Sequence, residues 1–321
     1  MRSHQGPTIT YTAVEHLSPN QRAWRRFKRN RPAIIGAVFL LAVVLLILIW
    51  PALAPYSPVA LSDAQFQPPT AKHWCGTDVH GRDLLARIIY GAQISLLVGA
   101  VGAGVSLVIG VTWGAVAGYL GGRWDSVMMR FVDILYSLPS IVFVIVLITT
   151  VEGFLKQSLI KISWLNNVLS SNAEATVRLL FLFAGLGAVS WLTMARIVRG
   201  QVLSLRNRSF VDASRALGAS HTRILFRHIL PNVFGVIIVY LTLTVPSVIL
   251  YESFLSYLGL GIQAPQASLG SLIADGAAQI NPVRVYWWTI IFPGGTLVLT
   301  LLALNFVGDG LRDAWDTRAE R

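Results

Sequence analysis

Six long apolar runs without a single Asp, Glu, Lys, Arg or His dominate this sequence, and they decide what it can fold into. The runs cover residues 33–50, 94–120, 134–151, 179–195, 233–251 and 285–307. A helix of about 20 apolar residues is long enough to cross a bilayer. Hydrocarbon offers no partner to an unpaired backbone N–H or C=O, so each run must be helical. The runs therefore predict an all-α polytopic membrane protein with six transmembrane helices.

Charged residues are scarce and unevenly placed between these runs. Only 13% of the chain is charged, whereas soluble domains carry about 25%. Assigning alternate loops to opposite sides places 19 of the 26 Lys and Arg residues on the side of the two termini and 7 on the other. The positive-inside rule then predicts cytoplasmic termini. We interpret the net charge of +11 as an orientation signal, and we expect no nucleic-acid partner.

The runs divide the chain into five predicted parts. These are a cytoplasmic tail at 1–31, a first transmembrane helix at 32–51, an external loop with an amphipathic helix at 52–93, a five-helix core at 94–308 that includes a cytoplasmic loop at 196–232, and a cytoplasmic tail at 309–321. The sequence "PALAPYSP" after the first run contains small residues like those of a signal-peptidase site. Because the run is longer than the usual apolar region of a signal peptide, we favour a retained span.

The second run and the segment before it carry two helical patterns. In residues 76–93, Leu84, Leu85, Ile88 and Ile89 share one face, with Arg82 and Arg87 off it. This pattern predicts an interfacial amphipathic helix leading into the second span. Within the run, Gly110, Gly114 and Gly118 repeat every fourth residue, a spacing that lets helices approach closely in lipid.

A basic segment, "VDASRALGASHTRILFRHILPN", separates the fourth run from the fifth at residues 211–232. Ala213 and Ala216 favour a helix, and a carboxylate at Asp212 suits the helix dipole near its start. Gly218 is expected to end this helix, since glycine accepts the left-handed conformation found at helix ends.

A second short helix is predicted after that turn. Ser220 can cap its start, and Pro231 would close it just before the fifth span. Leu225, Phe226, Ile229 and Leu230 would line one face, while Arg223 and Arg227 line another. Such a helix pair forms a lever that a partner can push; the alternative is a pair that simply lies on the membrane surface.

The spacing of this segment resembles the EAA loop of ATP-binding-cassette (ABC) importer permeases. That pattern runs acidic-Ala-Ala, three residues, Gly, nine residues, Ile, one residue, Leu-Pro. The matching positions are Asp212, Ala213, Ser214, Gly218, Leu230 and Pro231. Asp replaces the usual Glu, Ser replaces the second Ala, and His228 stands at the Ile position, while the spacing is kept.

The resemblance extends over about residues 22–316. "GTDVHGRDLLARIIYGAQISLLVG" and "LNFVGDGLRDAWD" look like signatures of the dipeptide/oligopeptide/nickel permease group. "SWLTMARIVRGQVLSL" and "VPSVILYESFLSYLGLG" look like those of the C subunits of oligopeptide permeases. The external stretch 152–178 is longer than these subunits usually have. The resemblance implies a type I ABC importer permease fold in a bacterial inner membrane.

The resemblance also implies partners and a mechanism. This subunit would pair with a second homologous permease, two cytoplasmic ATPases would bind ATP and Mg²⁺, and an external peptide-binding protein would deliver an oligopeptide. The chain itself would hold no cofactor and catalyse no reaction. Its coupling helix would sit in a groove of one ATPase, with the coupling residues Asp212, Ala213, Ser214, Arg215, Ala216, Gly218, Leu230 and Pro231. Within the group, dipeptides, murein peptides, nickel and antimicrobial peptides are alternative substrates.

Candidate pathway residues come from helix-breaking positions and from one acidic residue. Pro139, Pro246 and Pro293 each free a backbone carbonyl inside a run and permit a kink, which suits a pore lining or is ordinary helix bending. Ser247 follows Pro246 and is included with them. Glu252 ends the fifth run, and Asp275 lies in the last external loop. Each is interpreted either as a contact for a peptide amine or for the binding protein, or as a solvated charge at the rim, and Glu252 is the candidate gate residue.

Other activities find little support in the residues. The chain lacks the "GxxxxGK[ST]" phosphate loop, and the six runs lack the ionisable residues that proton- or sodium-coupled carriers often need. His221 and His228 have no nearby Cys or Glu, so no metal site is predicted. The single cysteine, Cys75, excludes an internal disulfide and is interpreted as a small apolar residue rather than a reactive thiol. A stand-alone channel or carrier and a membrane enzyme remain alternatives from other classes.

Overall fold

The structure is a computed structural model and describes residues 19–139, 141–146, 149–150, 171–262, 264 and 266–315 of the 321. Over these residues it is helical, and its only β-type pairing is an isolated bridge between Thr77 and Asp83. The elements are α1 Pro19–Arg29, α2 Arg31–Leu53, α3 Leu84–Leu120, α4 Gly122–Ser137, α7 Ser171–Leu205, α8 Ser209–Ala216, α9 His221–Arg223, the π-helix η1 Ile224–Ile229, α10 Leu230–Tyr257, α11 Leu269–Ala277 and α12 Trp288–Trp315.

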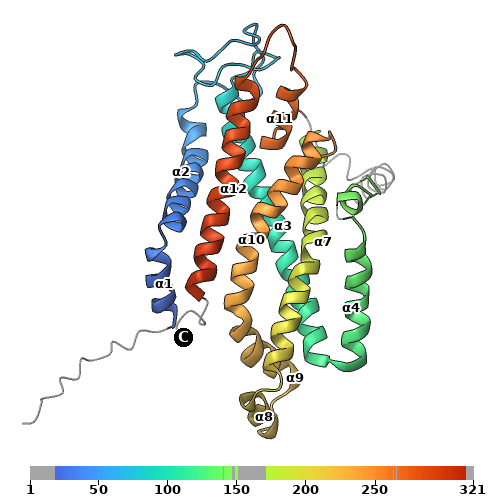
Figure 1. Ribbon diagram of the computed structural model, residues 1–321. Coiled ribbons are helices and arrows are strands. Elements are labelled where there is room, and N and C mark those ends of the chain that lie inside the picture. Colours follow the sequence, from blue (N-terminus) through green and yellow to red (C-terminus); the bar gives the residue numbers. More distant parts are fainter. Residues whose placement is uncertain are drawn as a thin grey trace, which may run out of the picture.

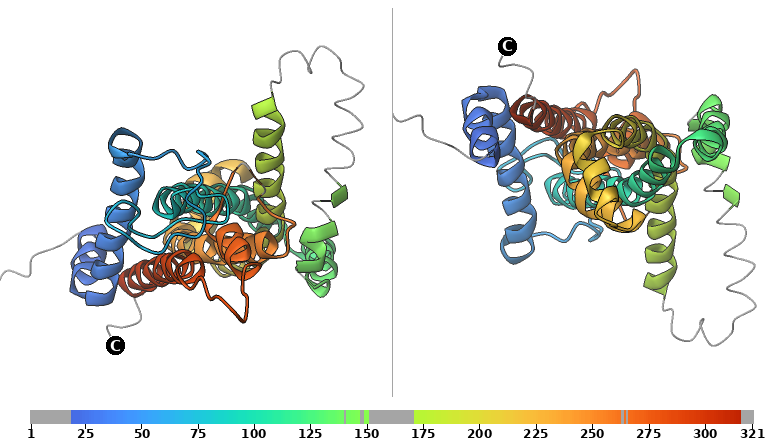
Figure 2. Two further views of the ribbon diagram at one scale, coloured as in Figure 1. Left: turned by 90° about the horizontal axis from the view of Figure 1, so that it is seen from above. Right: turned by 90° about the horizontal axis from the view of Figure 1, so that it is seen from below.

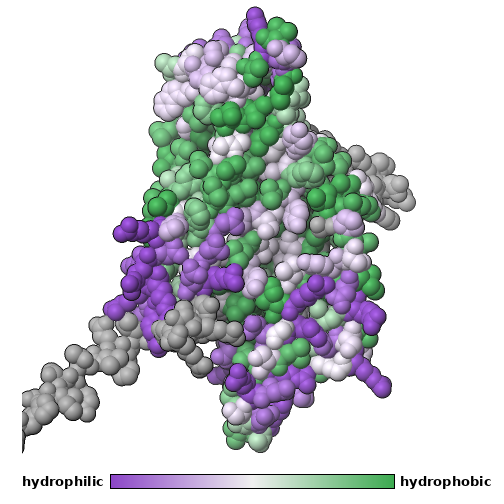
Figure 3. Space-filling model, viewed as in Figure 1, coloured by the Kyte–Doolittle hydropathy of each residue, from purple (hydrophilic) through white to green (hydrophobic). Residues whose placement is uncertain are grey.

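The long helices run side by side along one axis, as Figure 1 shows. Seen along that axis, α3 and α10 lie in the middle, and α2 and α4 lie at opposite edges (Figure 2). The short helices α8 and α9 protrude at one end, and α11 lies at the other together with the loop that precedes α3 (Figure 1). Hydrophilic side chains gather at the end that carries α1 and α8, next to a broad apolar zone (Figure 3).

Four stretches in the described part of the chain are long and apolar enough to cross a membrane. They are Arg31–Leu53, Leu84–Leu120, His221–Tyr257 and Trp288–Trp315. These stretches contain the first, second and fifth predicted runs and all but the first three residues of the sixth. The fourth run lies within α7, and the third continues past α4 into residues that are only partly described. The all-α membrane architecture is therefore confirmed, while the count of six spans stays a prediction.

Both predicted tails are partly helical. The basic stretch before the first span forms α1, whose Phe27 is buried with Ala33 of α2 and Ala314 of α12. Asn30 then caps α2, its side-chain oxygen accepting a 3.2 Å hydrogen bond from the Ala33 N–H. At the other end α12 continues to Trp315 and so includes the start of the predicted tail. Apolar side chains on α1 and α12 allow this packing. The helix α1 lies before the first apolar run, and α12 continues past the end of the last one.

The glycine stripe of α3 faces α7. A Cβ placed on Gly118 would stand 2.8 Å from the carbonyl oxygen of Arg199, and one on Gly114 would meet the backbone of Ala195. Gly110 approaches Met194 in the same way. The predicted close packing is confirmed, because only residues without a side chain let these two helix backbones come so near.

The amphipathic segment before the second span is not a separate interfacial helix, and that expectation is wrong. The helix begins only at Leu84, where the Asp83 carboxylate caps it by accepting a 2.8 Å bond from the Ala86 N–H, and it then runs unbroken to Leu120. Arg82 and Arg87 are buried rather than placed at a polar face. A local carboxylate, described below, offsets the cost of burying these charges.

Candidate coupling site and pathway

The helix α8 is a projecting element with one anchored side and one open side (Figure 1). Val211 is fully buried and packs in one apolar cluster with Ile224 and Ile229 of η1. The other sides of α8 carry the exposed side chains of Asp212, Ala213 and Ala216, and Arg215 is also exposed, one turn after Val211. Leu217, directly after the helix, is 88% exposed. The arrangement presents small and apolar side chains outward on a helix that is fixed from behind.

The predicted turn after α8 is present. Gly218 has a φ of +76°, and no atom lies within 4 Å of the place where its Cβ would be, so only backbone conformation demands glycine here. Its N–H donates to the Arg215 carbonyl at 2.9 Å, and the Ala219 N–H donates to Ser214 at 3.1 Å. Ser220 then caps α9 by accepting a 3.4 Å bond from the Arg223 N–H.

The second helix of the pair does not end at Pro231, contrary to expectation. α9, η1 and α10 follow one another without a break, so residues 221–257 form one helical stretch. A proline lacks an N–H and its ring clashes with the carbonyl four residues earlier. The wider π turn just before it, in which the Leu230 N–H donates to Leu225, relieves this conflict. Phe226, expected on the apolar face, is 63% exposed instead.

Arginines of the basic loop also brace the helices above α8, a role that sequence reasoning missed. The guanidinium of Arg199 donates two bonds to Asp125 of α4, at 2.5 Å and 2.6 Å. Arg206 donates to the carbonyls of Gly118 and Tyr119 at the end of α3, at 3.4 Å and 3.1 Å. These contacts join residues more than 70 positions apart, so no local pattern could have shown them. They fix the base from which α8 projects.

A cavity of about 490 Å³ lies between α4, α7 and α10. Its walls include the tyrosines Tyr136, Tyr240 and Tyr251, as well as Ser247. Ser247 is thus the one candidate pathway residue among those that line this cavity. Pro246 and Pro293 are buried within their helices, and Pro139 is exposed just after α4.

Glu252 is fully buried, so its interpretation as a solvated rim charge is wrong. Its carboxylate accepts hydrogen bonds from the hydroxyls of Ser256 at 2.6 Å and Ser95 at 3.3 Å. Ser95 in turn accepts the N–H of Leu269 at 3.2 Å, and Ser256 accepts that of Ile262 at 3.1 Å. Glu252 is therefore the hub of a buried network that joins α3, α10 and the start of α11.

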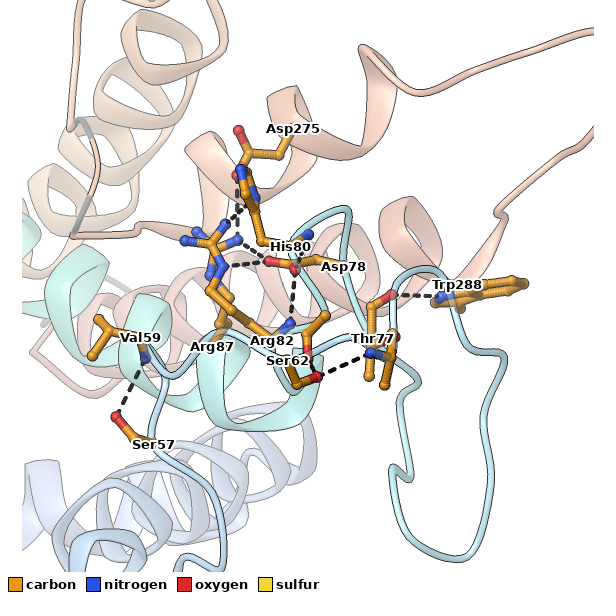
Figure 4. Close-up of polar contacts among 12 residues, drawn as sticks. Ser57, Val59, Ser62, Thr77, Asp78, His80, Arg82, Arg87, Asp275 and Trp288 are labelled. Carbon is orange, nitrogen blue, oxygen red and sulfur yellow. Dashed lines mark hydrogen bonds and ion pairs between the residues drawn. The ribbon is translucent and has the colours of Figure 1, made fainter.

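A second buried network lies at the same end of the molecule (Figure 4). Asp78 binds Arg82 at 2.7 Å and Arg87 at 2.6 Å, and Arg87 also reaches the half-exposed Asp275 of α11 at 3.4 Å. Burial by itself would raise the pKa of Asp78. The hydrogen bond from the Arg82 backbone N–H and the charges of both arginines outweigh that effect and lower the pKa below its ordinary value.

The remaining sequence candidates have structural surroundings of their own. Cys75 is half-buried, and burial together with the charge of Asp83 raises the pKa of its thiol to about 11. The Nδ1 atom of His221 lies 2.8 Å from the hydroxyl of Tyr119 on α3. Within the described residues no group of three or more His, Cys, Asp or Glu side chains could hold a metal ion.

Comparisons with known proteins agree with this architecture. Residues 18–69 match the family described as the N-terminal TM domain of oligopeptide transport permease C. The oligopeptide transport system permease protein OppC of Escherichia coli (strain K12) is 45% identical over 311 residues, which cover 95% of this chain and 93% of that protein. The dipeptide transport system permease protein DppC of Bacillus subtilis (strain 168) is 44% identical, with 95% and 88% covered.

A solved structure supports the fold. A chain from a structure of inward-facing conformations of the MetNI methionine ABC transporter superposes with a TM-score of 0.54 at 18% identity, covering 72% of this chain and 97% of that chain. The helices shared by the two chains therefore have the type I ABC importer permease arrangement. Residues 110–321, which include the projecting helix α8 and make up about two thirds of the sequence, match a single family. The chain belongs to the family of binding-protein-dependent transport system inner membrane components.

Proposed function

We propose that this chain is one of the two permease subunits of an ATP-driven importer for oligopeptides. It forms half of the translocation pathway in a bacterial inner membrane. Support comes from the family, from relatives of 45% and 47% identity that are named as oligopeptide permeases, and from the match to the N-terminal domain of permease C. A second permease subunit supplies the other half, and an external binding protein delivers the peptide.

Energy enters through α8, which inserts into a groove of a cytoplasmic ATPase. The observation that carries this proposal is the anchored helix with an open outer side formed by Ala213 and Ala216. Movement of α8 must displace its anchor, because Val211 belongs to the same buried apolar cluster as Ile224 of η1 and Val198 of α7. Both of those elements continue into the walls of the 490 Å³ cavity. ATP and Mg²⁺ bind to the partner ATPases, and this chain needs no cofactor.

The two termini and α8 lie on the cytoplasmic side in this proposal. The end of the molecule that carries α8 also carries the basic helix α1 and the end of α12 (Figures 1 and 3). The inner leaflet and the cytoplasm retain Lys and Arg during membrane insertion. The loop before α3 and the helix α11 then face outward, where the binding protein docks.

The direct test is purification of the epitope-tagged permease complex in mild detergent. The wild-type chain should co-purify with a second permease and with two ATPase subunits. Ala216→Arg adds a long charged side chain on the open side of α8, and we expect ATPase recovery to fall at least about tenfold, while the second permease is retained. A loss of both partners would indicate misfolding, and unchanged ATPase recovery would refute the docking site.

A matched control exists at the end of the molecule opposite α8 (Figure 1). Ala71 is exposed in the loop before α3, so Ala71→Arg makes the same chemical change far from α8. ATPase recovery should equal that of the wild type. This pair is cleaner than a substitution of Gly218, whose φ of +76° would strain any side chain.

Dipeptide import is the second candidate, and the 44% identity to a dipeptide permease favours it. Uptake assays with radiolabelled dipeptides and with tetra- and pentapeptides decide between the two. Preferred uptake of the longer peptides supports the first candidate.

A further inference from the structure

The outer surface of α3, η1 and α10 carries one groove that changes from apolar to basic along its length. Its upper part is a hollow of about 550 Å³ lined by apolar side chains and one threonine, including Val108, Thr112, Phe226 and Phe234. Its lower part is a hollow of about 460 Å³ whose lining includes Val116, Leu120, Arg206, Arg215 and His221.

The two hollows follow one another on the same helices. On α3, Thr112 of the upper part and Val116 of the lower part stand four residues apart and so share a helix face. On the opposite wall, Phe226 of the upper part directly follows Leu225 of the lower part. An elongated molecule can therefore lie in both at once, with its apolar part toward the membrane centre.

At the basic end of the groove, several hydrogen-bond donors have no acceptor in the described part of the chain. Arg206 uses its Nη1 and Nε atoms, and Arg215 uses its Nη1 atom on Asp212. The Nη2 groups of both arginines have no partner within the described residues, and neither does the Nε2 atom of His221. Asp212 is exposed, and no acidic residue is among those that line the lower hollow. Such a cluster of donors fits an oxyanion with several acceptor oxygens.

We propose that this groove binds an anionic phospholipid from the surrounding bilayer. One acyl chain lies along Val108, Thr112 and Phe234, and the phosphate accepts hydrogen bonds from Arg206 and Arg215. The occupant is a lipid because the upper hollow is apolar and opens on a transmembrane helix, Leu84–Leu120, whose exposed side chains include Val108 and Val116. The basic end of the protein lies where phospholipid headgroups begin.

The bound lipid would touch the coupling machinery directly. Arg215 belongs to α8, and Phe226 belongs to the π turn that links α8 to α10. A headgroup held between Arg206 and Arg215 bridges the end of α7 to α8. The lipid therefore stabilises one position of α8 relative to the helix bundle. This inference does not depend on which solute the permease carries.

The test uses the intact transporter in mild detergent and native mass spectrometry. Phosphatidylglycerol and phosphatidylcholine with identical acyl chains are added at equal concentration. We expect phosphatidylglycerol to be retained at least about fivefold more, since one basic residue near an anionic headgroup accounts for a factor of about that size. Equal retention of the two lipids by the wild-type transporter would overturn the proposal, and this comparison needs no variant to fold.

Two pairs of variants distinguish binding of the lipid headgroup from binding of the acyl chain. Arg206→Gln should reduce phosphatidylglycerol retention about fivefold, and Arg208→Gln, which removes an exposed charge two residues away that does not line the groove, should leave it unchanged. Thr112→Trp fills the upper hollow and should reduce retention of both lipids, whereas Val101→Trp, on α3 outside the groove, should not.

Two other results would count against the lipid. If Arg208→Gln lowers retention as much as Arg206→Gln, the effect is a general one of surface charge and the site is refuted. A photo-crosslinker at Val108 that captures the second permease in a complex without bound lipid would show that a protein covers the groove.

Discussion

The hydroxyl of Ser256 donates a 2.6 Å hydrogen bond to the carboxylate of Glu252, one helical turn earlier on α10, and both side chains are buried. Within the described residues no cation contacts this carboxylate, so neutral donors alone satisfy it. The donors are the hydroxyls of Ser95, Ser253 and Ser256, and Ser95 and Ser256 also accept backbone N–H groups from Leu269 and Ile262, at and before the start of α11. The network therefore holds this segment against α3 and α10.

Removal of the carboxylate should loosen that attachment. Glu252→Leu leaves the hydroxyls of Ser95 and Ser256 without their acceptor, at a cost of about 1–3 kcal/mol for each buried unsatisfied group. Glu252→Gln keeps one acceptor oxygen and should cost less. Thermal unfolding of the purified complex measures the order wild type, Gln, Leu. Equal melting temperatures for the Leu variant and the wild type would contradict the role of the network.

Close approach of α3 and α7 should make Gly114 intolerant of even one methyl group. Gly114→Ala places a Cβ against the backbone of Ala195, which cannot move without separating the helices, so we expect a destabilisation of about 1–3 kcal/mol. Gly104 lies on the same helix with no atom within 4 Å of its Cβ position. Gly104→Ala is thus the matched control and should be neutral or slightly stabilising. Chemical denaturation in detergent compares the two, and equal effects would refute the packing argument.

Acid should weaken the network around Asp78. Its pKa is lowered from the ordinary value of 3.8, so its contribution to stability is complete above about pH 4 and is lost as the pH falls through the lower folded value. Melting temperatures measured from pH 3 to 7 should therefore fall at the acid end. Asp78→Asn should flatten this dependence and lower the stability at pH 7, because it leaves Arg82 and Arg87 buried without a counter-charge. An unchanged acid slope in the variant would contradict this assignment.

Cys75 should react slowly with alkylating reagents at neutral pH. With a thiol pKa of about 11, the reactive thiolate is a minute fraction, and it should increase about tenfold per pH unit between 8 and 10. Maleimide labelling of the only cysteine gives this rate directly. A control thiol at the exposed position next to it, made as Trp74→Cys in a Cys75→Ser background, should react faster at pH 7. Equal rates would mean that burial does not protect Cys75.

The fold and the helix α8 could largely be predicted from sequence, because they depend on local patterns. Apolar runs predicted the membrane helices, the glycine stripe predicted a close helix contact on one face of α3, and Gly218 predicted the end of α8. Each pattern reflects a rule about neighbours on one helix. The same local reasoning was wrong at Pro231, because a π turn in the preceding residues lets the helix continue through the proline.

Local sequence patterns could not predict contacts between residues that are far apart in the sequence. The burial of Arg82 and Arg87 depends on Asp78 and Asp275, and the last of these lies about 190 residues further along the chain. Glu252 similarly needs Ser95, which is 157 residues away. The sequence places these groups at the ends of apolar runs, where a solvated charge is the default interpretation. Only the packing of α3, α10 and α11 shows that they are enclosed.

The unbroken helical stretch from His221 to Tyr257 has a consequence for energy coupling. At about 1.5 Å per residue it is about 55 Å long. One end adjoins α8, the proposed ATPase contact, and the other holds Glu252 and the segment that leads into α11. If both ends respond to the same tilt of this helical stretch, a partner bound at one membrane face must change the affinity for the partner at the other face. The factor is the same in both directions. Binding of the external binding protein would then favour ATP-driven closure of the ATPases by the same factor by which that closure raises the affinity for the binding protein.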